Sequence, residues 1–260
     1  MATELKRDAG RVLYLYGITE SLPARSASAE VLGVDQKSAV EPMECESVVC
    51  WISRVSAEEF EKDLNKNMEN LEWLAMASVA HQRALSAIRT QAEVLPARFG
   101  TVFRNLSSLR KHVRAGLREF QKDFKRLKDA DEWGVKVFAL PPAAKIASPA
   151  AASGRAYLMA RAALVPRNDS RPQTDRELEE FSRELERVAE ETAAVGKISG
   201  GQRGLTFQRS LLVKRTNRPH MESVLRKFSE RWADTRKIEC TGPWPPYSFV
   251  SAKAESAGSE

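Results

Sequence analysis

The chain has 260 residues, of which 42% are apolar and 29% are charged. These ordinary values exclude a fully disordered, collagen-like or fibrous chain, and the length favours two domains over one. The 41 Lys and Arg residues exceed the 35 Asp and Glu residues by six, an excess that permits an acidic partner without requiring one.

Neither a secretory signal nor a membrane span is expected. The basic residues near the N-terminus are followed by no apolar segment of the kind that signal peptides contain. The densest apolar run, residues 12–18, is far shorter than the roughly 20 residues that cross a bilayer. We therefore expect a soluble cytoplasmic protein without membrane insertion.

The first predicted elements are strands. Residues 12–16 are apolar or aromatic at every position, which predicts a strand covered on both faces and ended by Gly17. Two further extended stretches are predicted within residues 40–54, with a turn at residues 46–47 between them.

Two helices follow these strands. Ser56 and Glu59 have the spacing of a capping box, in which each side chain bonds the backbone N–H of the other residue, so a helix is expected to begin there. A longer helix is predicted over residues 68–89. Its apolar stripe comprises Leu71, Leu74, Leu85 and Ile88.

The next segment has the clearest helical pattern of the chain. It is preceded by a short extended stretch, residues 94–103, in which Pro96 lacks a backbone donor and indicates an edge or an irregular start. Residues 132–138 alternate in polarity and predict a strand after the helix. The helix itself has apolar residues at steps of three and four, namely Leu106, Leu109, Val113, Leu117, Phe120, Phe124 and Leu127.

The second half reads as helices and strands in alternation. One helix is predicted over residues 154–164, and another begins at a capping box in residues 174–177 and continues to Val195, with Gly196 as its C-cap. The remaining elements are a strand over residues 205–213, a helix capped by Asn217 and a strand over residues 237–240.

This order of elements predicts an α+β fold with two domains, each a small mixed or antiparallel sheet with helices packed on it. The Pro-, Ala- and Ser-rich residues 141–153 have the composition of a linker. The expected division is an N-terminal α+β domain over residues 1–140, a linker over 141–153, a C-terminal α+β domain over 154–250 and a disordered tail over 251–260.

No enzyme motif is found. Residues 198–203 resemble the signature loop of ABC transporter ATPases, but the chain lacks the phosphate-binding loop that ATP hydrolysis by those proteins needs. The glycines at positions 200, 201 and 204 therefore predict a flexible turn. The histidines and cysteines lack the spacing of zinc ligands. Arg98 is the one charged side chain in its apolar run, and it could bind an anion or form a structural salt bridge. We predict no catalytic, metal or cofactor site.

Residues 104–128 carry nine basic and two acidic side chains, an excess of seven that is larger than that of the whole chain. Three interpretations compete: a solvated helix face, a site for an acidic protein surface, and a phosphate or anionic-lipid patch. No aromatic residue interleaves with the charges, which argues against base stacking and nucleic acid. The candidate partner contacts are Arg110, Arg114, Arg118, Lys122 and Lys125.

Residues 241–250 contain three prolines around Trp244, a composition that predicts a stiff extended segment. We expect its aromatic rings to dock on the protein's own surface and so fix the C-terminus. A Pro-rich ligand for a groove in another protein is the alternative.

Five motifs resemble those of the gas vesicle protein GvpF/GvpL family, in the family's order across residues 12–250. Residues 14–18 resemble its opening strand, 94–103 its central L-P-x-R-F-G-T motif, 132–137 the end of its first domain, and 154–158 and 242–249 the motifs that bracket its second domain. Gln82 stands where the family usually has Glu, and Pro166 and Pro172 interrupt a stretch that is usually helical. The motif residues are Tyr16, Gly17, Pro96, Arg98, Phe99, Gly100, Thr101, Trp133, Gly134, Tyr157, Leu158, Gly242, Pro243, Trp244, Pro245, Pro246 and Tyr247.

The resemblance implies two α+β domains, the second with a modified ferredoxin-like fold. It also implies a minor, non-enzymatic structural protein that is required for assembly of the gas vesicle, a gas-filled protein shell within the cytoplasm. Contacts with the shell protein and with other accessory gas vesicle proteins are expected, without cofactor or nucleic acid. The alternatives are a small-molecule or anion-binding enzyme that uses the Arg98 region and, third, a nucleic-acid binder.

Overall fold

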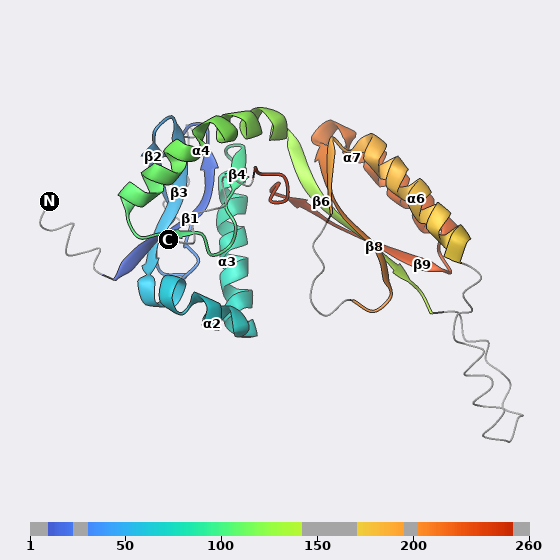
Figure 1. The fold of residues 1–260 in the computed structure, drawn as a ribbon, viewed down its shortest axis with the longest axis horizontal. Coiled ribbons are helices and arrows are strands. Elements are labelled where there is room, and N and C mark those ends of the chain that lie inside the picture. The colour runs from blue at the N-terminus through green and yellow to red at the C-terminus, as the bar shows by residue number, and fades with distance from the viewer. Residues whose placement is uncertain (1–9, 23–30, 142–170, 195–201, 252–260) are drawn as a thin grey trace, which may run out of the picture. The chain divides into compact units, whose positions relative to one another are not determined.

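The computed structural model describes residues 10–22, 31–141, 171–194 and 202–251. The chain divides into two compact units, which are described separately below. Unit 1 comprises Met1–Asp129 and Pro245–Glu260, and unit 2 comprises Ala130–Trp244. Both combine helices with an antiparallel sheet, so the chain is α+β, as predicted (Figure 1).

This division differs from the boundary expected at residues 141–153. Strand β6 (Ala130–Ala139) was assigned to the first domain, but its backbone pairs on one side with β8 (Leu205–Lys214) and on the other with β9 (Arg236–Trp244), so it belongs to unit 2. The chain returns to unit 1 at Pro245. Most of the expected linker, the predicted helix over 154–164 and the tail beyond Ser251 lie outside the described residues.

Unit 1 is built on a five-stranded sheet in which β2, β3, β1 and β4 are neighbours in that order and β5 also pairs with β1. Every position of β1 after Arg11 is buried, as expected for a strand covered on both faces. The strands are β1 (Arg11–Thr19), β2 (Glu41–Cys45), β3 (Val48–Ser56), β4 (Val94–Pro96) and β5 (Val102–Phe103). The helices are η2 (Glu58–Lys62), α2 (Leu64–Glu69), α3 (Leu71–Arg89) and α4 (Leu106–Leu127).

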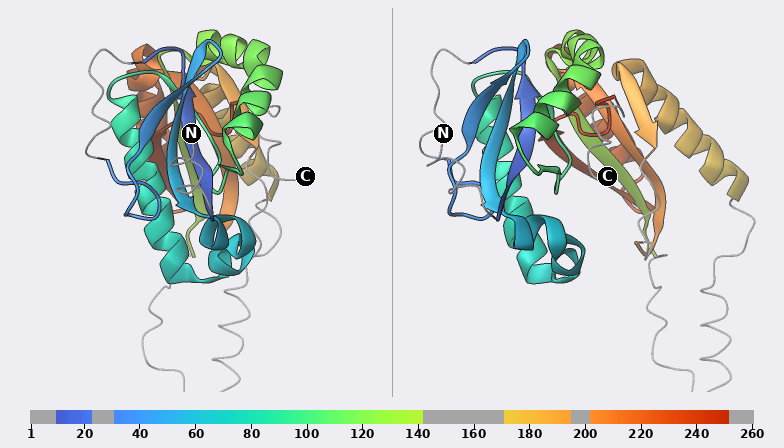
Figure 2. Two further views of the ribbon diagram at one scale, coloured as in Figure 1. Left: turned by 90° about the vertical axis from the view of Figure 1, so that its left-hand side faces the viewer. Right: turned by 60° about the vertical axis from the view of Figure 1, so that its left-hand side comes forward.

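Helices α3 and α4 cover opposite faces of this sheet (Figure 2). Tyr14 of β1 reaches toward α3, where its hydroxyl is bonded to the His81 imidazole. Leu13, on the other face of β1, is paired with Phe103, whose ring lies 5.1 Å from that of His112 on α4. Because successive side chains of a strand point to opposite faces, these contacts place the two helices on the two sides.

The predicted helix over residues 106–127 is confirmed, but the one over 68–89 is divided into α2 and α3 at Asn70. The Asn70 side chain accepts hydrogen bonds from the backbone N–H groups of Glu72 and Trp73 and so caps α3. Leu71 was expected on the buried stripe, but it is 80% exposed. At 100° per residue it lies about 100° from the buried Ile88, at the edge of the stripe.

Strand β1 was expected to end at Gly17 but continues to Thr19. The pairing of β1 with β3 shifts between Leu15 and Gly17, which marks a bulge. A Cβ atom at Gly17 would lie 2.7 Å from the Leu95 carbonyl oxygen of β4, so glycine lets the two backbones approach closely.

Unit 2 is a four-stranded antiparallel sheet in the order β7-β8-β6-β9. Helices α6 (Arg171–Val188) and α7 (Arg218–Arg231) lie on one face of it (Figure 1). The core between them contains the buried rings of Phe181, Phe228 and Trp232, with ring centroids about 5 Å apart. The element order β-α-β-β-α-β agrees with the ferredoxin-like fold that the resemblance implies. The assignment of unit 2 to that fold stays a prediction.

The predicted limits of helix α6 are wrong at both ends. The helix begins at Arg171, before the expected capping box at residues 174–177, and it ends at Val188 rather than at Val195. Residues Glu191–Ala194 instead form strand β7, paired with β8. Backbone hydrogen bonding to β8 therefore overrides the helical propensity of this short stretch.

Candidate interaction surface

The opening motif contributes a buried hydrogen-bonded network to unit 1. The Gly100 N–H donates to the Tyr14 hydroxyl at 3.0 Å, and this hydroxyl lies 2.9 Å from His81 Nδ1. The Tyr16 hydroxyl accepts from the Val34 N–H at 2.7 Å and is bonded to Ser53 Oγ at 2.8 Å. Burial raises the pKa of both tyrosines, that of Tyr16 to about 12, so both hydroxyls stay protonated at neutral pH.

Burial lowers the pKa of His81 to about 4, so the imidazole is neutral at pH 7. The Tyr14 hydroxyl accepts a hydrogen bond from the Gly100 N–H and forms a second hydrogen bond with His81 Nδ1. Nε2 is buried without a hydrogen-bond partner. The imidazole also stacks on the Tyr16 ring, with ring centroids 5.6 Å apart.

Arg98 is exposed and lines a hollow of about 300 Å³, together with Ser78, His81, Gln82, Phe99 and Tyr247. Ser78 and His81 form no hydrogen bond with each other, so they lack the geometry of an activated nucleophile. A His81 pKa of about 4 also makes the imidazole a poor base at neutral pH. The geometry therefore does not favour the enzyme alternative.

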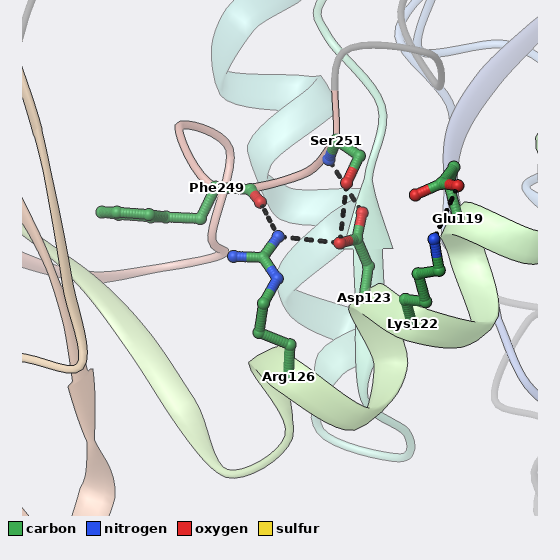
Figure 3. A network of polar contacts seen from close by, with 6 residues as sticks. All are labelled: Glu119, Lys122, Asp123, Arg126, Phe249 and Ser251. Carbon is green, nitrogen blue, oxygen red and sulfur yellow. Dashed lines mark hydrogen bonds and ion pairs between the residues drawn. The ribbon is translucent and has the colours of Figure 1, made fainter.

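Part of the C-terminal segment docks on unit 1, as predicted, whereas Trp244 belongs to unit 2 and is 40% exposed. The Tyr247 hydroxyl is bonded to Gln82 Oε1 at 3.2 Å, and Phe249 and Val250 are buried. Asp123 of α4 is 1% exposed and accepts hydrogen bonds from the Ser251 N–H at 2.8 Å and from Ser251 Oγ at 2.9 Å (Figure 3).

Arg126 completes this C-terminal anchor. Its guanidinium forms an ion pair with Asp123 at 2.7 Å and donates to the Phe249 carbonyl oxygen (Figure 3). Sequence reasoning missed the role of Asp123. The available signal was an acidic residue three positions after Phe120, in register with the buried stripe of the helix.

The motif residues of unit 2 that the structure describes lie in or beside the paired strands β6 and β9. Gly242 has φ 141°, and a Cβ atom there would lie 2.8 Å from the Trp133 ring and 2.9 Å from the Glu132 carbonyl oxygen. Only glycine adopts this conformation without strain. Trp244, at the end of β9, is 40% exposed, and Tyr157 and Leu158 lie outside the described residues.

The five candidate contact residues lie on one exposed face of α4, which we call the basic ridge. It comprises Arg110, Arg114, Arg118, Lys122 and Lys125.

Two of the five side chains of the ridge form intramolecular ion pairs. Arg114 pairs with Glu46 at 2.7 Å, and Lys122 pairs with Glu119 at 3.0 Å. Arg118 and Lys125 have no acidic partner among the residues that the structure describes. Their charges are therefore available to a partner of opposite sign, and an exposed unpaired charge is retained in water without penalty.

Two features are absent from the described residues. Within the ranges that the structure describes, no helix has both the length and the apolarity of a transmembrane segment. The same residues contain no cluster of three His, Cys, Asp or Glu side chains suited to a metal ion.

Known proteins match this chain over most of its length. The sequence profile of the family described as gas vesicle synthesis protein GvpL/GvpF matches residues 12–251. Gas vesicle protein L of Streptomyces sp. (strain CB03234) is 34% identical over 206 residues, which cover 75% of this chain and 76% of that protein.

Two crystal structures are similar in fold. Gas vesicle protein GvpF from Anabaena sp. PCC7120 has a TM-score of 0.66 at 17% identity, with 93% of this chain and 96% of that chain covered. GvpF from Microcystis aeruginosa has a TM-score of 0.66 at 16% identity, with 92% and 99% covered. The chain belongs to the GvpL/GvpF family of gas vesicle proteins.

Proposed function

We propose that this protein is a non-enzymatic assembly protein of gas vesicles within the cytoplasm, which binds acidic side chains of the shell protein or of another accessory gas vesicle protein through the basic ridge of α4. The observation that carries the proposal is the exposed line of five basic side chains on a chain of this family, two of them without an intramolecular acidic partner. Helix positions separated by three and four residues form a continuous stripe, so one acidic surface meets all five.

The ridge suits a protein partner better than a ligand that enters a pocket. The opposite side of α4 packs in the core, where Leu109, Val113 and Phe120 are buried. The helix therefore cannot rotate to bury its charges. Exposed charges of one sign raise the association rate and set the orientation of an acidic partner, and their effect decreases with salt.

The decisive variant is Arg118→Glu/Lys125→Glu. It changes the charge of the ridge by four and breaks no intramolecular ion pair, whereas reversal of Arg114 or Lys122 would also oppose Glu46 or Glu119. The variant is coexpressed with the other gas vesicle proteins of the same organism, and copurification and buoyant vesicles are scored. We expect at least a tenfold loss of the copurified partner and no buoyant vesicles.

Arg183→Glu/Arg226→Glu is the matched control, because it changes the same charge at two exposed helix positions of unit 2. It is expected to copurify partners as the wild type does. Equal copurification by the ridge variant and the wild type would refute the ridge as the contact. A loss that the control shares to the same extent would reduce the effect to net charge and would also refute it.

A further inference from the structure

Helix α3 carries an apolar face on the side opposite to its buried stripe. Leu71 is 80%, Val79 58% and Met76 51% exposed. Single exposed apolar residues are common, but several on one helix face indicate an interaction site. We call the surface formed by Leu71, Glu72, Ala75, Met76, Val79 and Arg83 the α3 face.

The α3 face has a charge of opposite sign at each end. At 100° per residue, Glu72, Met76, Val79 and Arg83 fall within about 60° of one another, so they form one line along the helix. Glu72 and Arg83 are exposed, are about 16 Å apart along the axis and have no ion-pair partner among the described residues. An acidic end and a basic end separated by apolar residues match an identical helix that runs in the opposite direction.

The centre of the face is hollowed. A depression of about 340 Å³ is lined by Ala75, Met76, Val79, Ala80 and Arg83, together with Gln36. Two alanines in its wall let the backbone of a second helix approach closely, and the flexible methionine side chain adapts to fill the space that remains.

We propose that the α3 face binds a second copy of this chain, with the two α3 helices antiparallel about a two-fold axis near residues 77 and 78. This register places Glu72 opposite Arg83 of the second copy and Met76 opposite its Val79. Each contact then occurs twice, as in any interface of this symmetry. The proposal does not depend on the function assigned to the basic ridge.

The contact is small, because the face spans only about four turns of one helix. Interfaces below about 1,200 Å² of total buried surface are typically weak, so we expect a dissociation constant of micromolar order or weaker. The dimer would therefore form where the protein is concentrated and dissociate on dilution.

Sedimentation equilibrium of the full chain tests the proposal. Between about 10 µM and about 500 µM, the weight-average mass of the wild type is expected to rise from near 29.0 kDa toward twice that value. Glu72→Arg and Arg83→Glu each oppose like charges twice in the dimer, so each variant alone is expected to stay monomeric. Thermal unfolding of both variants checks that these exposed substitutions leave the fold intact.

The mass of an equimolar mixture of the two variants tests the proposed pairing of Glu72 with Arg83 most directly. When Glu72→Arg is mixed with Arg83→Glu in equal amounts, both cross-pairs regain opposite charges, and we expect the mass to rise again as it does for the wild type. A wild type that stays monomeric at the highest concentration overturns the proposal. So does self-association that neither variant weakens, or a mixture that remains monomeric.

Discussion

Replacement of Asp123 with Asn removes one negative charge from the C-terminal anchor and leaves the side-chain volume almost unchanged. The carboxylate accepts hydrogen bonds from Ser251 N–H at 2.8 Å, Ser251 Oγ at 2.9 Å and the Arg126 guanidinium at 2.7 Å. Because Asp123 is 1% exposed, water does not reach this side chain to replace a hydrogen bond that it loses.

The amide of Asn has only one acceptor oxygen. Its NH₂ group must face either the Ser251 N–H or the Arg126 guanidinium, so that two donors oppose each other. Loss of one charge-assisted hydrogen bond with an unsatisfied donor costs about 2–3 kcal/mol. The Arg126 side chain is 35% exposed, so water keeps the loss below the roughly 3–5 kcal/mol of a fully buried ion pair.

Hydrogen exchange at the backbone amide of Ser251 measures this loss directly, because the exchange rate follows the free energy of local opening. We expect exchange in Asp123→Asn to be about 30-fold to 150-fold faster, since each 1.4 kcal/mol is a factor of about ten. Glu119→Gln is the matched control on the same helix. The Lys122 side chain is 67% exposed and that of Glu119 is 31% exposed, so their ion pair contributes at most about 1 kcal/mol to stability. Equal exchange rates in the two variants would refute the assigned role of Asp123.

Three further predictions concern stability. When the pH falls from about 7.5 to about 5, His81 binds a proton in the unfolded chain but not in the folded protein. The reason is that burial lowers the pKa of His81 to about 4, below its value in the unfolded chain. The free energy of unfolding should fall by about 2 kcal/mol more in the wild type than in His81→Gln, measured with urea at both pH values, and an equal fall would contradict the pKa. Gly17→Ala sets Cβ 2.7 Å from the Leu95 carbonyl oxygen and should cost about 3 kcal/mol. An unchanged calorimetric Tm would rule out this close approach. Phe228→Ala should destabilise unit 2 by about 3–5 kcal/mol and leave hydrogen exchange in unit 1 unchanged, whereas a loss of protection in both units would show that they unfold together.

Local patterns predicted the elements whose polar and apolar residues alternate with a regular period. Helix α4 has the limits that its apolar periodicity indicated, and strand β6 lies where residues alternate. Gly17 and Gly242 belong to the family motifs, and the structure shows which atoms lie too close to each of them for a Cβ atom.

The candidate surfaces were predictable to different degrees. The basic ridge could be read from the sequence, because charges at helical spacing lie on one face whatever the tertiary structure is. The α3 face could not, since Leu71 appeared to continue the buried stripe and its exposure depends on where the neighbouring elements end.

The sequence alone determined the α+β class, most helices and the family, because these follow from local periodicity and motifs. Three features depend on contacts between distant parts of the chain: residues 191–194 form a strand, β6 belongs to unit 2, and Asp123 binds Ser251, which is 128 residues away. The physical reason is that neither of two distant segments specifies by itself which partner its donors and acceptors will meet. The pairing arises when the chain brings their donors and acceptors together away from water.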